Sequence, residues 1–182
     1  MADMWVTAGP DPRDAGEQPV GEKATYVDYL RIYRHTLALK CEDLTPEQLA
    51  TRSVPPSSLS LLGLVRHLAG VEQFWFAQTA LGLDEPRPFR TPEHRDLDFD
   101  GAAPTESCVT EAFDRWRSEV ARAEAWVDAV PEVDLGLELV IPGRGGEVVT
   151  IRDLLVHMIE EYARHCGHAD LLREAIDGRT GQ

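Results

Sequence analysis

Residues 150–178 read TIRDLLVHMIEEYARHCGHADLLREAIDG, a stretch that predicts one long helix. Thr150 and Asp153 form a pattern typical of a helix start, because the hydroxyl can cap the first turn and the carboxylate lies within it. Gly178 follows the periodic pattern, as glycine often does where a helix ends. We therefore expect this helix to run from Thr150 to about Ile176.

One face of this helix combines apolar and ionisable side chains. At about 100° per residue, four ionisable residues share the stripe of Leu154 and Leu172, namely His157, Glu161, His165 and His168. Burying imidazoles and a carboxylate is costly unless something pairs with them, and a metal ion would do so. Glu161 and His165 lie one helical turn apart, so both side chains can reach one ion.

A third ligand has to come from another helix, and His67 is the candidate. It shares an apolar stripe with Val71 and Phe74, and Gly70 leaves space beside it. Three protein ligands leave one position open for water or substrate, as in catalytic zinc sites. Two alternatives fit the same spacing. His67 can be a core histidine satisfied by a carboxylate, and the pair on the last helix can be a surface ion pair.

The other two histidines of the last helix are expected to support the site or pack in the core. His157 lies two turns from His165, about 12 Å along the axis, so the two cannot easily ligate one ion. We expect the same supporting role for His168. Cys166 points about 100° away from His165 and is interpreted as a packing residue.

The rest of the chain predicts three more long helices and one short one. The long helices are expected at about Ala24–Cys41, from Ser58 or Ser60 to about Leu81, and at Thr105–Val130. The sequence Thr45-Pro46-Glu47-Gln48 predicts a short helix, because it combines a capping hydroxyl, a proline in the first turn and a glutamine three residues after the cap.

Two segments lack helical periodicity. Alternating apolar residues and the turn Pro142-Gly143-Arg144-Gly145-Gly146 predict a β-hairpin between Leu135 and Val149. Residues 84–104 hold four prolines and many acidic residues, so we expect a loop there. Loops of this length are usually functional, for example as lids.

Composition limits the partners and the compartment. The 182 residues suit one domain, with residues 1–22 as an extended N-terminal arm and residues 23–182 as a metal-binding helical bundle. A net charge of −14 argues against binding nucleic acid or an anionic membrane, which needs clustered Lys and Arg. No apolar run approaches the roughly 18 residues of a membrane span. Three cysteines without CxxC spacing give no disulfide framework, so we expect a cytoplasmic protein.

Two motifs carry a resemblance to a known family. Residues 64–69, LVRHLA, and residues 157–170, HMIEEYARHCGHAD, resemble the DinB-like superfamily. They are similar in particular to its actinobacterial branch of mycothiol-dependent maleylpyruvate isomerase and mycothiol S-transferases. The resemblance covers the chain from about Tyr26 to Gly178. It implies an all-α, DinB-like four-helix bundle of up-down-down-up order, with a small β-hairpin before the last helix.

The resemblance also implies a metal site and an activity. The triad would be His67, Glu161 and His165, with Glu161 standing where many DinB-like proteins have a histidine. The ion would be divalent, with Zn²⁺ best suited to mixed nitrogen and oxygen ligands and Ni²⁺ or Fe²⁺ as alternatives. The implied function is a metal-dependent, mycothiol-type S-transferase or thiol-dependent isomerase that acts on small electrophiles as a homodimer.

A non-catalytic role stays open as the alternative to this activity. The chain can instead be a metal-stabilised, stress-response binding protein whose ion is structural. A fourth ligand from His157 or His168, which would close the open position, would favour this alternative.

Overall fold

The computed structural model describes residues 11–14 and 18–181, so the predicted arm lies largely outside the described residues. The described part of the arm contacts the bundle at Arg31. Arg31 donates hydrogen bonds of 2.8 and 2.6 Å to the carbonyl oxygens of Pro12 and Arg13.

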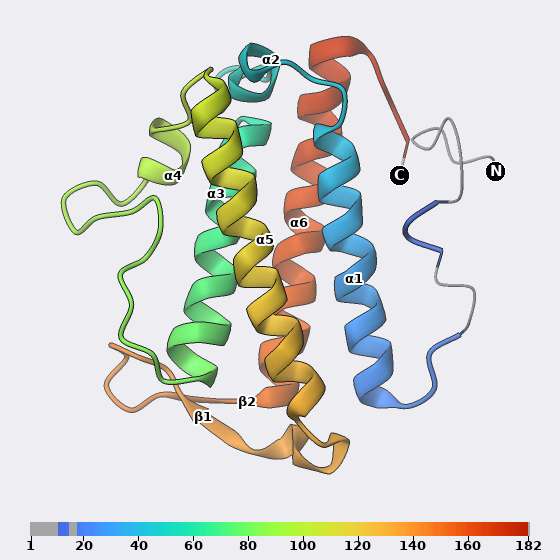
Figure 1. Cartoon of the computed structure of the whole chain (residues 1–182), viewed down its shortest axis with the longest axis vertical. Helices are drawn as coiled ribbons and strands as arrows, with labels where there is room; N and C mark the ends of the chain where they lie inside the picture. Colours follow the sequence, from blue (N-terminus) through green and yellow to red (C-terminus); the bar gives the residue numbers. More distant parts are fainter. Residues whose placement is uncertain (1–10, 15–17, 182) are drawn as a thin grey trace.

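Four long helices form the bundle. They are α1 (Glu22–Cys41), α3 (Leu61–Glu72) with its π-helical continuation η1 (Gln73–Ala80), α5 (Glu106–Ala129) and α6 (Ile151–Asp177). In Figure 1 they run up, down, down and up, with α1 packed against α6 and α3 against α5. This confirms the predicted all-α bundle and its order. No helix in the described ranges is long and apolar enough to cross a membrane.

The predicted helix boundaries are confirmed where a capping residue marked them. Ser60, Thr105 and Thr150 each accept a hydrogen bond from a backbone N–H in the first turn of the following helix. Thr45 and Gln48 form a full capping box at the start of the short helix α2 (Pro46–Ala50). Gly178, with φ of 76°, ends α6 in the left-handed conformation that glycine adopts most easily.

A long crossover joins η1 to α5, the two consecutive long helices that run in the same direction. Because η1 and α5 both point down, the chain between them has to return to the opposite end, and residues 81–105 do so along one side (Figure 1). This segment contains a short helix, α4 (Leu97–Asp100), where the sequence predicted only a loop. The helix has no side-chain N-cap, and contacts with α3 hold it in place. Four residues without a cap give no recognisable sequence pattern.

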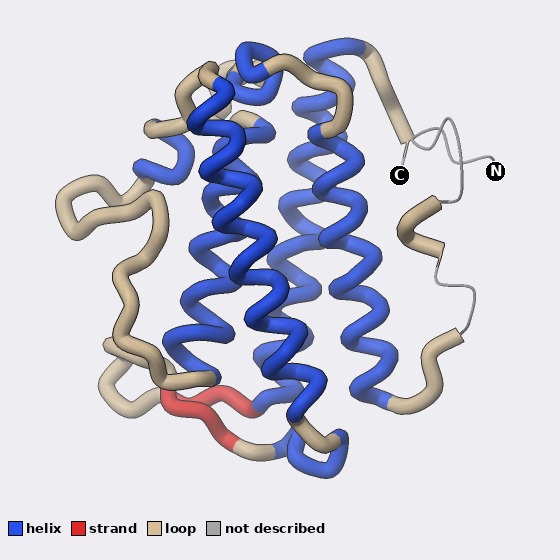
Figure 2. The backbone as a smooth tube through the Cα atoms, viewed as in Figure 1, coloured by secondary structure: helices blue, strands red, loops and turns tan. Residues whose placement is uncertain are grey.

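The predicted hairpin is present at one end of the bundle. Figure 2 shows its two antiparallel strands, β1 (Glu138–Val140) and β2 (Val148–Thr150), which follow a short 3₁₀-helix, η2 (Glu132–Gly136). Leu139 lies opposite Val149, and both pack against the core. Leu137 precedes the strand and is exposed, so the alternation expected from the sequence begins at Leu139 and continues to Ile141, which is buried directly after the strand.

One buried hydrogen-bond network joins all four long helices. Glu72 on α3 receives hydrogen bonds of 2.9 and 3.0 Å from Arg34 on α1 and one of 2.7 Å from the Tyr162 hydroxyl on α6. The same hydroxyl accepts a 2.8 Å bond from the Trp116 indole on α5. Burial alone would lower the pKa of Arg34, but the carboxylate of Glu72 outweighs it, so the pKa is raised and the guanidinium stays charged.

Candidate metal centre

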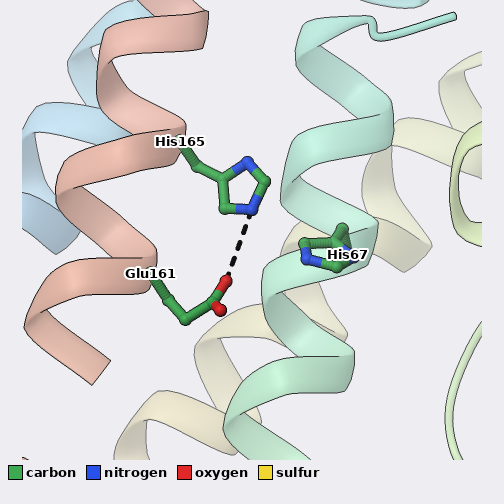
Figure 3. Close-up of side chains that lie close together, drawn as sticks. All are labelled: His67, Glu161 and His165. Atoms are coloured by element: carbon green, nitrogen blue, oxygen red, sulfur yellow. Dashed lines mark ion pairs between the residues drawn. The ribbon is translucent and has the colours of Figure 1, made fainter. Parts of the chain in front are cut away.

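Three side chains predicted as ligands converge between α3 and α6. His67 projects from α3, and Glu161 and His165 project from successive turns of α6 (Figure 3). One donor atom from each residue can be chosen so that all three lie within 4.8 Å of one another. The His165 Nε2 atom is 3.5 Å from a Glu161 carboxylate oxygen, and the His67 and His165 rings are 4.8 Å apart. These three residues therefore form a cluster that could hold a metal ion.

His67 is oriented by a carboxylate that the sequence analysis missed. A carboxylate oxygen of Asp98 lies 2.9 Å from its Nδ1 atom, and the Phe99 ring stacks on the imidazole at 5.1 Å. With Nδ1 engaged, Nε2 is the ring nitrogen left for another partner. Asp98 lies in the segment predicted to be a plain loop, and no spacing in the sequence relates it to His67.

The crossover is fixed to α3 so that Asp98 reaches this position. Arg66 donates hydrogen bonds of 2.9 and 3.0 Å to the carbonyl oxygens of Asp98 and Leu97. One turn earlier, Gly63 lets Phe99 approach closely, since a Cβ atom there would stand 2.9 Å from the Phe99 ring. Arg66, which directly precedes His67 in the sequence, thus anchors the crossover segment whose Asp98 orients the His67 ring.

His157 and His168 lie beside the cluster. The Nδ1 atom of His168 is 3.3 Å from Nδ1 of His165, which leaves the Nε2 atom of His165 facing Glu161. His157 stands on the other side, with its Nε2 atom 3.6 Å from a Glu161 oxygen and its ring against Trp75. Neither residue belongs to the three-residue cluster found among the described residues, and the supporting roles expected for them stay predictions.

The cluster favours the charged form of its carboxylate. His165 lowers the pKa of Glu161, outweighing the rise that burial would cause, and His157 and His67 act in the same direction. Glu161 is therefore an anion at neutral pH, the form in which a carboxylate binds a metal.

A cavity of about 480 Å³ opens onto the cluster. His67, Glu161 and His157 contribute to its wall. Its apolar lining comes from η1, the end of α3 and the hairpin, through Val71, Phe74, Trp75, Ile141, Val148 and Val149. Arg87 from the crossover and Arg144 from the hairpin turn add positive charge. The volume suits a small molecule.

Residues 25–178 match the model of a family described as mycothiol-S-transferase. A solved structure, a conserved protein from Enterococcus faecalis, resembles the chain with a TM-score of 0.56 and 19% identity. The similarity covers 86% of this chain and 95% of that one, and at this identity it shows the fold alone. A comparison with curated proteins found no match.

Proposed function

Because this chain belongs to the mycothiol-S-transferase family, we propose that it joins a small thiol of mycothiol type to a small electrophile, using a divalent metal held by His67, Glu161 and His165. The thiol releases its proton to solvent, its sulfur forms a bond to an electrophilic carbon, and the leaving group departs with the electrons of the bond that breaks. A thiol-dependent isomerisation would instead add the thiolate to a carbon–carbon double bond, allow rotation about the resulting single bond and expel the same thiolate, with no other group lost. The observation that carries the proposal is the convergence of three donors at the wall of the cavity.

The donor set fits a zinc ion. Two imidazoles and one carboxylate, with a position left open, match catalytic zinc sites. The Asp98 contact resembles the carboxylate that commonly supports a zinc-bound histidine. A bound ion would favour the deprotonated, nucleophilic form of a coordinating thiol. Ni²⁺ and Fe²⁺ suit the same donors.

The reacting thiol has to come from outside the chain. All three cysteines are buried, namely Cys41, Cys108 and Cys166. Burial raises the pKa of Cys41 and of Cys166 to about 12, so both stay protonated and unreactive at neutral pH. A thiol cosubstrate is therefore the source of sulfur that the proposal requires.

The cavity residues have separate tasks in this proposal. Asp98 holds His67 so that one ring nitrogen faces the cluster, and His168 does the same for His165. Phe74 and Trp75 form an apolar wall that limits water near the reacting sulfur and carbon. This proposal places the protein in the reducing cytoplasm, where small thiols stay reduced.

The non-catalytic alternative needs a site without an open position. Among the described residues the cluster contains three potential ligands, and His157 and His168 stand outside it. Three ligands beside a cavity favour the enzyme over a structural metal site.

Metal analysis and cobalt spectroscopy test the proposal together. Alanine at His67, Glu161 or His165 should sharply lower the zinc content of protein purified without a nickel column, while the control His168→Ala should retain most of it. In Co²⁺-loaded protein, mycothiol should add a sulfur-to-metal charge-transfer band. Full zinc content in all three variants would refute the ligand assignment. If mycothiol, bacillithiol, glutathione and cysteine all left the cobalt spectrum unchanged, S-transfer would lose its physical basis.

The assembly state belongs to the proposal as well. The resemblance to DinB-like proteins suggests a homodimer, which sedimentation equilibrium of the full chain would test. A monomeric mass at micromolar concentration would contradict it.

A further inference from the structure

Arg87 stands in the wall of the metal cavity, and no carboxylate of the described residues lies within ion-pairing distance of it. It comes from the crossover, and its guanidinium lies 4.2 Å above the centre of the Phe74 ring. None of the ion pairs or hydrogen bonds between described residues involves Arg87. A guanidinium offers five N–H donors, and a planar carboxylate matches two of them at once.

The carboxylates that line the same cavity have other partners. Glu147 lies 3.7 Å from Arg144, its neighbour in the hairpin turn. Asp153 accepts a 2.7 Å hydrogen bond from the Thr150 hydroxyl at the start of α6. Glu161 faces the histidines of the cluster. The cavity has two arginines. Arg144 forms an ion pair with Glu147, whereas Arg87 forms no ion pair with a carboxylate of the described residues.

The surroundings of Arg87 concentrate positive charge in an otherwise acidic protein. Burial lowers the pKa of Arg87, and the charges of Arg90 and Arg144 act in the same direction, while the more distant carboxylate of Asp98 raises it and offsets them only in part. Arg90 and Arg95 line a second cavity together with Arg87, formed by residues of the crossover. An anion bound at Arg87 would relieve this repulsion, although the chain as a whole carries a net charge of −14.

We propose that Arg87 binds a carboxylate of the electrophile, so that the preferred substrate is a small, largely apolar electrophile that carries a carboxylate group. The inference rests on the proposed S-transfer. The apolar wall of Val71, Phe74 and Trp75 takes the hydrocarbon part, and the metal cluster lies in the same cavity. The carboxylate itself is unchanged in the reaction. Sulfur bonds to a carbon of the electrophile, and the leaving group, such as a halide, takes the electron pair of the broken bond.

Binding of unreactive analogues tests the site without turnover. We compare 3-phenylpropionate with 3-phenylpropionamide, which differ in charge but hardly in shape, on the zinc-loaded full chain by calorimetry. The carboxylate should bind about tenfold tighter or more, as expected for a charge-assisted pair. Arg87→Gln should abolish this preference. Arg95→Gln, which removes the same charge from an exposed position on the same segment, should preserve it.

The contrary result is equally clear. A preference that survives in Arg87→Gln would mean that the carboxylate binds the metal or another cation, and it would overturn the proposal. Equal binding of the acid and the amide by the unaltered protein would also overturn it.

Turnover then identifies which reactant carries the carboxylate. Iodoacetate and iodoacetamide are compared as electrophiles for 2-mercaptoethanol, a thiol without a carboxylate. The ratio of kcat/KM for iodoacetate over iodoacetamide should fall about tenfold or more in Arg87→Gln and stay unchanged in Arg95→Gln. A ratio unaffected by Arg87→Gln, together with a selective loss for 3-mercaptopropionate as the thiol, would assign the residue to the thiol and refute the proposal.

These measurements separate the two levels of inference. If no electrophile reacts but Arg87→Gln still abolishes the preference for 3-phenylpropionate, S-transfer fails and the anion site stands. If S-transfer proceeds without any dependence on Arg87, the proposed function stands and the substrate class fails.

Discussion

Among single side chains, Asp98 has the greatest influence on the candidate site beyond the three potential ligands. It is buried, its carboxylate meets Nδ1 of His67 at 2.9 Å, and the Arg66 guanidinium holds its backbone carbonyl. A histidine that ligates through one nitrogen is fixed in tautomer and direction by the partner of the other. Asp98 would therefore be a positioning residue for a metal that it does not touch.

Replacing this carboxylate should weaken metal binding while leaving the fold intact. We expect Asp98→Asn to lower zinc affinity about 10- to 100-fold, the usual cost of losing such a supporting partner. Competition with a chromophoric chelator measures the affinity, and circular dichroism checks the helices. Asp100→Asn is the matched control, because Asp100 is exposed and pairs with Arg52 at the surface. Equal affinities in the two variants would contradict the role given to Asp98.

The buried thiols predict a loss of stability at alkaline pH. The folded state raises the pKa of Cys41 from 9.0 to about 12, so folding holds the proton more tightly than the unfolded chain does. Each such buried cysteine makes its full contribution to the free energy of unfolding below pH 9. This contribution declines as the pH rises toward 12, by roughly 2 kcal/mol at pH 10.5. Urea unfolding at pH 8 and pH 10.5 measures the change. Cys41→Ala should show a smaller alkaline loss than the unaltered chain, and an equal loss would refute the assignment.

At the scale of elements, the crossover does more than connect two helices. Its short helix α4 packs on α3 and brings Asp98 to His67, while its first half brings Arg87 into the cavity wall. Gly63 permits this packing, because a side chain there would meet both the ring and the backbone of Phe99. The connection that the parallel pair of helices requires has thus become part of the site.

A methyl group on α3 should disturb this arrangement. Gly63→Ala places a Cβ atom 2.9 Å from the Phe99 ring and should shift α4, so we expect weaker zinc binding. The clash should lower the free energy of unfolding by about 1–3 kcal/mol, partly offset by the better helix propensity of alanine. Gly167→Ala on α6 is the control, since its Cβ atom meets no neighbouring atom within 4 Å. That variant should gain about 0.5–1 kcal/mol and keep its metal affinity. Zinc titration and urea unfolding separate the outcomes, and a Gly63→Ala protein with unchanged affinity would show that α4 tolerates the shift.

The elements also show which features the sequence could reveal. Capping residues and periodicity correctly predicted the four long helices, the hairpin and the stripe that carries Glu161 and His165. Such signals are local, because they depend on hydrogen bonds within one turn or on which residues share a face. Asp98 and Arg87 gave no such signal. Their positions depend on how a proline-rich crossover lies against α3, which only tertiary contacts determine. The sequence predicted a helix over the residues of η1 but did not reveal its π-helical form, because their composition also suits an ordinary α-helix.

At the scale of the whole molecule, the buried network fixes how the four helices meet. Arg34, Glu72, Trp116 and Tyr162 come from four different helices, and each depends on the others for its hydrogen bonds. A slip of one helix along another would leave a buried charge or a buried hydroxyl without its partner, which is costly. Glu72 and His67 both belong to α3, so the network also sets the height at which His67 faces α6.

Removing one hydroxyl should weaken the whole bundle. We expect Tyr162→Phe to lower the free energy of unfolding by about 1–3 kcal/mol, because the Trp116 indole N–H loses its acceptor and Glu72 loses a donor in the core. Urea unfolding followed by circular dichroism measures the change. Tyr26→Phe serves as a control, since the Tyr26 hydroxyl contacts Glu22 near the surface. A loss in Tyr162→Phe no larger than in the control would mean that the network contributes little to stability.

The pairing of α1 with α6 has a consequence for the order of folding. Contacts between the first and the last long helix join parts of the chain more than 100 residues apart, and closing so long a loop is entropically slow. Glu161 and His165 lie on α6, so the cluster cannot assemble on the ribosome until that helix has been synthesised and has docked. Any metal would then be captured at the last step of folding, and the nascent chain would have no complete site with which to compete for the ion.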